Sequence, residues 1–312
     1  MVLMWAIGGL LIYLAIGKKM EPGLLLPMGF GAILVNLPFS GAVTQGLVEG
    51  PLNVLFAAGF SNELFPLLLF IGIGAMIDFG PLLEKPWLLL FGAAAQFGIF
   101  LTLCLAGLFF DLKDAASIAV IGAADGPTAI FVANTLGSKY LGAIMVAAYS
   151  YMALVPMVQP PVIRLVTTKK ERLIRMPYTK GNVSKLTRIL FPIIVTIVSG
   201  LAAPASVALV GFLMFGNLLR ECGVLDSLSQ TAQTALANLI TIILGLTVAC
   251  QMTAEQFVRP DTLLILALGL VAFVGDTVGG VLFAKLLNLF LPEGKKVNPM
   301  IGAAGISAFP MS

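Results

Sequence analysis

Residues 121–131 read IGAADGPTAIF, and they place a carboxylate, Asp125, inside an apolar run. A charged side chain at membrane depth costs roughly 2.5 to 3.5 kcal/mol, so it indicates function. Gly126 and Pro127 follow, and both disfavour a continuous helix, because glycine tolerates unusual backbone angles and proline lacks an N–H donor. Backbone freed in this way needs protein or a wet cavity to satisfy it. The stretch therefore predicts a broken membrane segment that lines a cavity, with Asp125 as its working residue.

The composition of the whole chain is that of a membrane protein. Of its 312 residues 59% are hydrophobic and 11% are charged, and the mean hydropathy is +1.03. These values exclude a soluble domain and indicate the lipid bilayer, not nucleic acid, as the partner surface. Histidine is absent, which excludes histidine metal sites and Ser-His triads. With Cys104, Cys222 and Cys250 isolated from one another, no transition-metal site is expected, and Na⁺ is the metal that the sequence favours.

Apolar runs of near-spanning length recur along the chain, and they predict an all-α polytopic membrane protein. There are about ten of them, at 2–17, 24–39, 64–83, 87–110, 116–135, 140–165, 189–203, 205–219, 235–250 and 262–287, with a short piece at 297–311. The only substantial polar segment covers residues 166–188.

A repeat is visible within these runs. IGAAD at 121–125 returns as IGAAG at 301–305, and each copy is followed by a hydroxyl residue, an alanine and a phenylalanine. Interrupted segments at corresponding places in two halves are typical of a transporter binding site.

The distribution of lysine and arginine predicts how the first copy is inserted. If 116–135 dips into the membrane and returns, most basic residues fall on the side of the basic loop 166–188, which the positive-inside rule places in the cytoplasm. The two copies then enter from opposite faces, as inverted repeats each containing a broken or re-entrant segment. The expected division is residues 1–139 for the first repeat, 140–188 for the linking span and basic loop, and 189–312 for the second repeat.

Oxygen-bearing side chains beside the breaks are candidate Na⁺ ligands. Asp125 is a hard-cation ligand that also holds a proton, or a carboxylate that caps a half-helix. Thr128, Asn298 and Ser307 offer neutral oxygens, although polar residues that pack helices look the same in a sequence. Asp276 lies deep in an apolar run. Three interpretations are open for it: a second ion or proton site, an ion pair with Lys285, or hydrogen bonds between helices.

Longer motifs then identify a family. They are ADGPTAIF at 124–131, AAYSYMALVP at 147–156, QPPVIRLVTTKKER at 159–172, LMFGNLLRE at 213–221, GGVLFAKL at 279–286 and NPMIGAAGISAFPM at 298–311. They closely resemble the beta subunit of the sodium-pumping biotin-dependent decarboxylases, whose complexes act on oxaloacetate, glutaconyl-CoA, methylmalonyl-CoA or malonate. The resemblance implies a translocase in a bacterial or archaeal cytoplasmic membrane. It would take carboxybiotin from a carrier, release carbon dioxide and export Na⁺ while a proton is consumed.

The resemblance also assigns roles to single residues. The family's essential aspartate falls on Asp125 and its functional tyrosine on Tyr151, as a proton donor or substrate ligand; a packing aromatic is the plain alternative for Tyr151. Its asparagine, glycine and serine fall on Asn298, Gly302 and Ser307, which the resemblance implies to belong to the Na⁺ site. Asn298 would also bind substrate, and Ser307 would also be catalytic. Ala123 stands where the family usually has glycine. The family pattern continues past Ser312 with a functional arginine and a further helix, so a C-terminally truncated chain is expected.

The implied partners are a biotin carrier subunit, a carboxyltransferase subunit and a small single-span subunit, and a homo-oligomer is left open. The basic loop 166–188 is either a docking surface for these partners or only a determinant of topology. Two rival functions remain at this point. One is a secondary Na⁺-coupled carboxylate or Na⁺/H⁺ transporter without chemistry, and the other is a structural anchor for soluble subunits.

Overall fold

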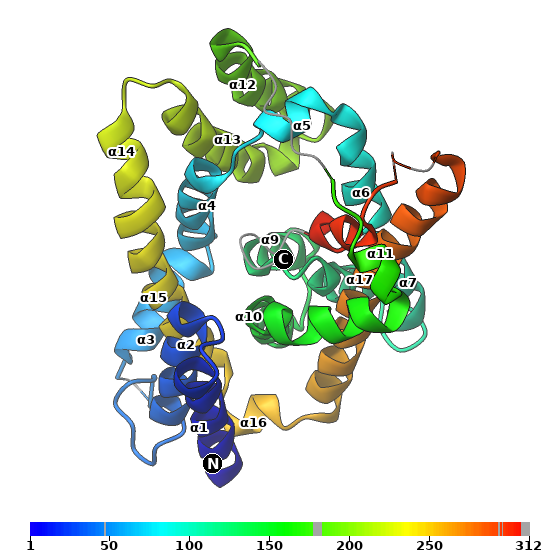
Figure 1. Cartoon of the computed structure of the whole chain (residues 1–312). Coiled ribbons are helices and arrows are strands. Elements are labelled where there is room, and N and C mark those ends of the chain that lie inside the picture. Colours follow the sequence, from blue (N-terminus) through cyan, green and yellow to red (C-terminus); the bar gives the residue numbers. More distant parts are fainter. Residues whose placement is uncertain (47, 177–182, 293, 295, 307–312) are drawn as a thin grey trace. The chain divides into compact units, whose positions relative to one another are not determined.

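The computed structural model describes residues 1–46, 48–176, 183–292, 294 and 296–306. Every regular element in this part is helical, which confirms the all-α class (Figure 1). Within the described residues, five segments are long and apolar enough to cross a membrane: Pro86–Ala106, Leu141–Val166, Lys185–Ala202, Asp226–Gln251 and Pro260–Phe290. A sixth arises if the bent pair Pro51–Phe60 and Leu64–Met76 is one span. The count of about ten spans is therefore not confirmed.

The chain forms two compact units that alternate along the sequence. Unit 1 comprises Met1–Ser40, Leu88–Tyr178 and Val248–Ser312, and unit 2 comprises Gly41–Trp87 and Thr179–Thr247. All of the candidate site residues that the structure describes belong to unit 1.

Unit 1 is built on two long helices, α10 (Leu141–Val166) and α17 (Pro260–Phe290), which pack against each other (Figure 1). Its other elements are α1 (Val2–Gly17), α2 (Pro22–Val35), α6 (Leu89–Ala94), α7 (Phe97–Ala106), α8 (Leu112–Ala119), η3 (Val120–Ala123), α9 (Gly126–Leu136), α11 (Lys169–Arg172), η6 (Ala249–Gln251), α16 (Ala254–Phe257) and η7 (Pro299–Gly305). At 1.5 Å per residue, α17 is about 46 Å long, which exceeds the roughly 30 Å of a hydrocarbon core.

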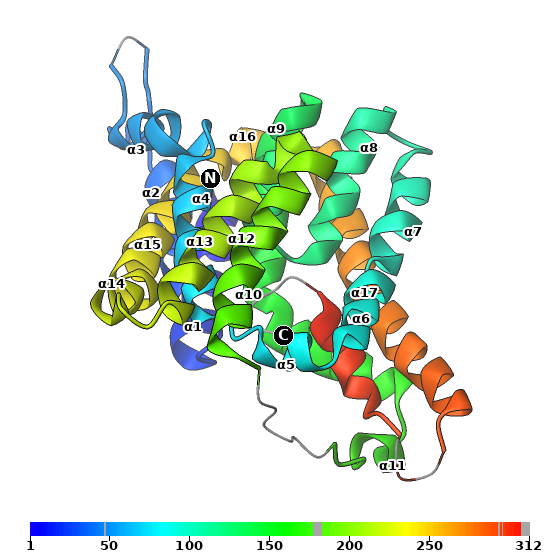
Figure 2. The ribbon, with the colours of Figure 1, turned by 90° about the horizontal axis from the view of Figure 1, so that it is seen from above.

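The segment around IGAAD is a hairpin whose two ends lie together. α8 has 8 residues and α9 has 11, so each is too short to span a bilayer. Asp114 near the start of α8 accepts a 2.7 Å hydrogen bond from Ser138 Oγ, just after α9, and its carboxylate lies 3.5 Å from Lys139 Nζ. The chain thus enters and leaves this hairpin at the same end (Figure 2).

Two further interruptions lie in unit 1. The apolar segment Pro86–Ala106 breaks at Ala95 and Gln96, between α6 and α7. The second IGAA copy forms the 3-10 helix η7, which packs against α17 and α6. The first copy is also 3-10, as η3. Both copies therefore contain a 3-10 helix, which ends at Ala123 in the first copy and continues to Gly305 in the second.

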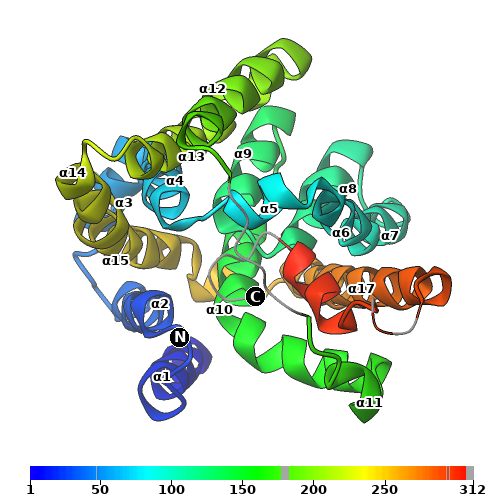
Figure 3. The ribbon, with the colours of Figure 1, turned by 45° about the horizontal axis from the view of Figure 1, so that its top comes forward.

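Unit 2 is centred on the crossing of α4 (Leu64–Met76) and α13 (Val207–Glu221), with α12 (Lys185–Ala202) beside α13 (Figure 3). Its remaining elements are α3 (Pro51–Leu55), η1 (Phe56–Phe60), α5 (Gly80–Glu84), η4 (Pro204–Ser206), α14 (Asp226–Thr231), η5 (Ala232–Leu236) and most of α15 (Ala237–Val248). Asn217 Nδ2 donates to the Ile77 carbonyl at 2.9 Å, and Arg220 donates to the Met76 carbonyl at 2.6 Å. The last carbonyls of α4 are thereby satisfied by α13.

Candidate functional site

Asp125 is the N-cap residue of α9, immediately after a sharp change in backbone direction. Its carboxylate accepts a 2.6 Å hydrogen bond from Thr128 Oγ1 and a longer one, 3.5 Å, from the Thr128 backbone N–H. The side chain is only 9% exposed. The preceding residue, Ala124, has a φ of 51°, in the left-handed region where an alanine is strained. The break thus places a carboxylate in a buried position, held by a single hydroxyl residue and its backbone.

Gly126 and Pro127 act differently from the sequence expectation. The unusual backbone angle falls on Ala124, while Gly126 begins α9 and Pro127 occupies its first turn, where a missing N–H costs nothing. The small size of Gly126 matters instead, because a Cβ there would lie 2.7 Å from the ring of Tyr149. Tyr149 is fully buried and interacts electrostatically with the Asp125 carboxylate.

Asp276 caps a helix that belongs to another segment. It lies on α17, is 0% exposed, and its Oδ1 accepts a 3.0 Å hydrogen bond from the Ile99 backbone N–H. The Gly98 N–H also bonds this carboxylate. Both N–H groups lie in the first turn of α7, where backbone donors have no acceptor within their own helix. This turn lies beside the break in the Pro86–Ala106 segment. Of the alternatives for Asp276, interhelical hydrogen bonding is therefore observed.

The second oxygen of Asp276 has no hydrogen-bond partner among the described residues and is inaccessible. It points at the first IGAA copy, because a Cβ added to Gly122 would lie 2.6 Å from Asp276 Oδ2. An unsatisfied carboxylate oxygen inside a protein is costly unless a proton or a cation completes it. Asp276 thus links the break between α6 and α7 to η3. Its Oδ2 can still accept a proton or bind a cation.

The interruptions of unit 1 converge on one small cluster of buried side chains. The cluster comprises Ala95, Ala124, Val155, Phe273 and Ile306. Ala95 lies in the break between α6 and α7, Ala124 precedes Asp125, and Ile306 follows η7. The residue before Asp125 and the residue after η7 therefore belong to the same buried cluster.

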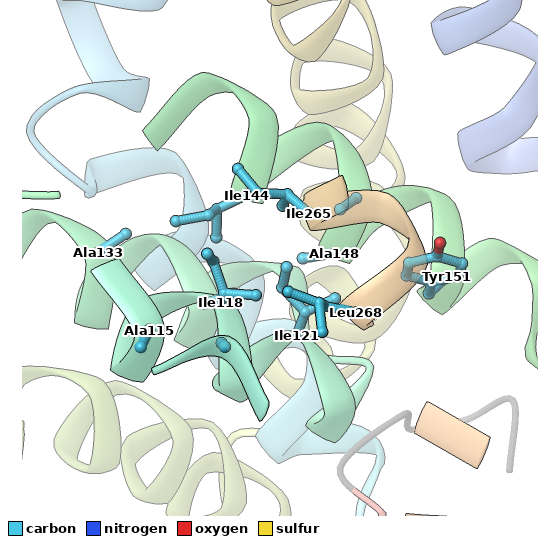
Figure 4. Packing of buried hydrophobic residues seen from close by; sticks show 12 residues of the cluster. Ala115, Ile118, Ile121, Ala133, Ile144, Ala148, Tyr151, Ile265 and Leu268 are labelled. Atoms are coloured by element: carbon cyan, nitrogen blue, oxygen red, sulfur yellow. The ribbon is translucent and has the colours of Figure 1, made fainter. Parts of the chain in front are cut away.

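Tyr151 is a packing residue in this conformation. It is 9% exposed and belongs to a hydrophobic cluster with Ile121, Leu268 and neighbouring residues. Figure 4 shows it at the edge of that cluster, beside α17. Its hydroxyl donates to the Leu266 carbonyl. A phenol held by a backbone carbonyl orients α10 against α17 and must leave that carbonyl before it can donate elsewhere.

Asn298 ties the start of η7 to the segment after α11. Its Oδ1 accepts from the Met300 N–H at 3.0 Å, and its Nδ2 donates to the carbonyls of Arg172 and Ile174, both at 3.0 Å. None of these hydrogen bonds joins Asn298 to Asp125. Ser307 lies outside the described residues.

Gly302 touches α17 directly. A Cβ on Gly302 would lie 2.0 Å from the carbonyl oxygen of Gly280, and a Cβ on Gly280 would lie 2.0 Å from the carbonyl oxygen of Gly302. Two backbones can approach this closely only where neither residue has a side chain. Gly302 is therefore required for η7 to pack closely against α17.

Sequence reasoning missed Gln159 as a site residue. This side chain of α10 is 6% exposed, and its Nε2 donates to the Ala303 carbonyl of η7 at 2.7 Å. A glutamine directly before Pro160 and Pro161 in a membrane span is the signal that identifies it, since a buried amide needs a partner.

Lys285 pairs with α11 and not with Asp276. Its Nζ lies 3.2 Å from Glu171 Oε1 and donates to the Val166 carbonyl at 3.1 Å. The Thr168 backbone N–H, the Thr168 hydroxyl and Lys285 together hold the pKa of Glu171 below its ordinary value. The end of α17 is thus joined to α11 by an ion pair that is charged at neutral pH.

A cluster of charges in unit 2 was also missed. Asp78 lies 3.9 Å from Arg188 and 4.0 Å from Arg220, and Glu221 lies 3.6 Å from each arginine. Because the cluster is balanced and Arg220 also holds the end of α4, we interpret it as structural.

A polytopic helical protein with broken membrane segments and buried carboxylates belongs to the class of ion-translocating membrane proteins. The chain matches the family model described as "Na+-transporting oxaloacetate decarboxylase beta subunit" over residues 1–312, and it belongs to that family. This confirms the resemblance drawn from the motifs and the assignment to sodium-transporting decarboxylases.

Curated relatives agree with this family. The methylmalonyl-CoA decarboxylase subunit beta of Propionigenium modestum is 47% identical, over 100% of this chain and 84% of its own length. The glutaconyl-CoA decarboxylase subunit beta of Acidaminococcus fermentans is 49% identical, over 99% of this chain and 81% of its own length. The oxaloacetate decarboxylase beta chain of Klebsiella pneumoniae is 44% identical, over 97% and 83%.

Proposed function

We propose that this chain removes carbon dioxide from carboxybiotin presented by a partner subunit and couples that step to outward Na⁺ transport, with a proton consumed. The observation that carries the proposal is the buried carboxylate of Asp125 at a helix break, in a chain that belongs to a Na⁺-transporting decarboxylase family throughout its length. A buried carboxylate needs a proton or a cation as its companion, and exchange between these two is the coupling that such a pump requires.

Asp125 and Thr128 would form the first part of the Na⁺ site. Both oxygens of this pair are hard ligands, and their 2.6 Å hydrogen bond keeps them side by side. Asp276 would supply a second ion or proton position, since its Oδ2 lacks a partner among the described residues. Asn298, Gly302 and Ser307 would belong to the facing wall, where Gly302 acts by close packing and Asn298 by holding the start of η7.

Tyr151 and Asn298 would contact the substrate, with Tyr151 and Ser307 assisting the proton transfer. The step breaks the N–CO₂⁻ bond of carboxybiotin and leaves a ureido anion, which a proton then neutralises. Tyr151 would first have to release the Leu266 carbonyl. Substrate binding that moves α10 relative to α17 would therefore free the donor.

The topology proposed is a pair of inverted repeats, 1–139 and 189–312, joined by the span and basic loop 140–188. Support comes from the shared 3-10 conformation of η3 and η7 and from the joined ends of the α8–α9 hairpin, which favour a re-entrant path for 116–135. The basic loop would face the cytoplasm of a bacterial or archaeal cell, where the biotin carrier and carboxyltransferase subunits approach. A small single-span subunit and further copies of this chain would complete the complex.

The substitution Asp125→Asn tests the ion site. An asparagine retains N-cap ability, so the helix start should survive while the charge is lost. We expect Na⁺-dependent decarboxylation by the purified complex to fall about a hundredfold or more. The variant would remove the carboxylate from the proposed Asp125–Na⁺ pair, and removing one partner of a buried charge pair costs about 3–5 kcal/mol. Asp226→Asn, at an exposed carboxylate of α14, is the matched control. Near-normal pumping by Asp125→Asn would sink the assignment.

A second measurement separates the reaction from simple transport. If the chain is a secondary Na⁺-coupled transporter, the purified complex will move Na⁺ without releasing carbon dioxide from free carboxybiotin. The proposal requires that release, and requires it to depend on Na⁺.

A further inference from the structure

The amide of Gln159 links α10 to the second IGAA copy. Its Nε2 donates to the Ala303 carbonyl at 2.7 Å, across 144 positions of sequence. Gln159 is 6% exposed and Ala303 is 3% exposed, so both groups are shielded from water. Ala303 lies in the last turn of η7, where carbonyls have no N–H partner within their own helix. The bond therefore satisfies a buried amide and a buried carbonyl at once.

Gln159 shares one face of α10 with two residues that lie at the site. Tyr151, Val155 and Gln159 follow the spacing i, i+4, i+8, which places them along one side of a helix. Val155 belongs to the buried cluster that also contains Ala124 and Ile306. This face of α10 therefore meets both the break before α9 and the end of η7.

Two side chains of this face donate to backbone carbonyls outside α10. The Tyr151 hydroxyl donates to the Leu266 carbonyl of α17, and the Gln159 amide donates to the Ala303 carbonyl of η7. η7 in turn packs closely on α17 through a contact between two glycines. A displacement of α10 relative to α17 that frees the Tyr151 hydroxyl therefore also pulls on the Gln159 bond.

The sequence around Gln159 lowers the cost of such a displacement. Pro156, Pro160 and Pro161 all lie inside α10. Because proline has no N–H, each of them leaves the carbonyl four residues earlier without its helical hydrogen bond. The part of α10 that carries Gln159 is thus held by fewer helical bonds than the part before it.

We propose that Gln159 is a positioning residue for the Na⁺ site and couples movement of α10 to the second IGAA copy. The inference rests on the proposed function, in which Asp125 and Thr128 form one part of the site and η7 belongs to the facing wall. While the Leu266 carbonyl holds Tyr151, the Gln159 amide keeps η7 in the position that binds Na⁺. When α10 moves and Tyr151 is released, the Gln159 bond is lost and η7 no longer supports the ion. Gln159 acts through η7 and is not itself a ligand.

The test measures Na⁺ affinity from the Na⁺-dependent rise in Tm of the detergent-purified complex, with K⁺ replacing Na⁺ so that the ionic strength is constant. Gln159→Met keeps the length of the side chain and removes the donor. Gln233→Met is the matched control, because the Gln233 amide bonds to Ser229 one helical turn earlier in unit 2. The Na⁺ concentration that gives half of the rise should increase about tenfold in Gln159→Met, since the lost bond leaves a buried carbonyl unpaired, and should not change in the control.

Two further measurements separate positioning from a purely structural role. Hydrogen exchange at residues 299–305 should accelerate in Gln159→Met, because η7 loses its tether to α10. In Na⁺-dependent release of carbon dioxide from free carboxybiotin, the KM for Na⁺ should rise while kcat at saturating Na⁺ stays close to that of the wild type. If Gln159→Met does not yield a folded complex, Gln159→Asn is measured in the same way, since its amide is one methylene too short for the bond.

An unchanged Na⁺ midpoint in the Gln159 variant would overturn the proposal, whether or not exchange at 299–305 changes. A lower kcat with an unchanged KM for Na⁺ would overturn it too, because that pattern marks a structural role. Failure of the proposed function is seen separately: a wild type whose Tm responds to Na⁺ but which releases no carbon dioxide contradicts the reaction and leaves the Na⁺ titration valid. A wild type whose Tm does not respond to Na⁺ would contradict the ion site and, with it, the role of Gln159.

Discussion

The contact between Gly302 and Gly280 gives the sharpest quantitative prediction. A Cβ at Gly302 would lie 2.0 Å from the Gly280 carbonyl oxygen, whereas real Cβ contacts stay beyond 3.0 Å. The Gly302→Ala variant must therefore displace η7 from α17 by about 1.0 Å. Both atoms belong to backbone or sit directly on it, so no change of rotamer relieves the clash. Overpacking of this kind costs about 1–3 kcal/mol, a fall in Tm of roughly 2–10 °C.

The matched control is Gly92→Ala in α6, where an added Cβ meets nothing within 4 Å. Alanine is the better helix former by about 0.5–1 kcal/mol, so this variant should be as stable as the wild type or slightly more stable. Thermal unfolding in detergent and Na⁺-dependent decarboxylation are measured for both variants. If Gly302→Ala unfolds within a degree of Gly92→Ala and retains full activity, η7 does not pack on α17 as described.

Three further predictions concern single polar contacts, two in unit 1 and one in unit 2. Asn298→Asp keeps the acceptor for Met300 but loses both donated bonds, so hydrogen exchange at 172–174 should accelerate; unchanged exchange would contradict the tether. The pKa of Glu171 is lowered in the folded state, so its contribution is complete above the ordinary value of 4.5 and is lost only as the pH falls below it. The difference in Tm between wild type and Glu171→Gln should therefore be equal at pH 7.5 and at pH 6, and a difference that shrinks at pH 6 would refute this. Arg220→Met should lower the stability of unit 2 by about 2–3 kcal/mol, because it removes a charged donor from the Met76 carbonyl; an unchanged Tm would argue against that role.

Much of the site's local structure follows from sequence alone. The apolar composition predicted the all-α membrane class, and the repeated IGAA motif marked two segments that share an unusual helix type and converge on one cluster. Asp125 was expected at a helix break, and its capping alternative is the geometry observed. These features are local or depend on the cost of burying charge, which a sequence displays directly.

Other features depend on packing between distant segments and were not predictable. The sequence around Ala95 does not indicate that this apolar segment is interrupted. The backbone N–H groups of Gly98 and Ile99 that the break leaves without a helical acceptor bond instead to Asp276, about 180 residues later. Gly126 and Pro127 were expected to interrupt the helix, but the left-handed backbone angle falls on Ala124, and Gly126 leaves space for the ring of Tyr149. The number of spans also stays unconfirmed, because several of the apolar runs are shorter than a straight span, and hydropathy alone does not distinguish a crossing from a hairpin.

The contacts of α17 have a consequence for motion. One face of this helix meets the first turn of α7 through Asp276, η3 through Gly122 and η7 through Gly280. A slide of α17 along its axis by a single residue, about 1.5 Å, would exceed the tolerance of all these contacts at once. The three interrupted segments are therefore all fixed at set positions along the axis of α17. None of them can shift along that axis while the other two stay in place.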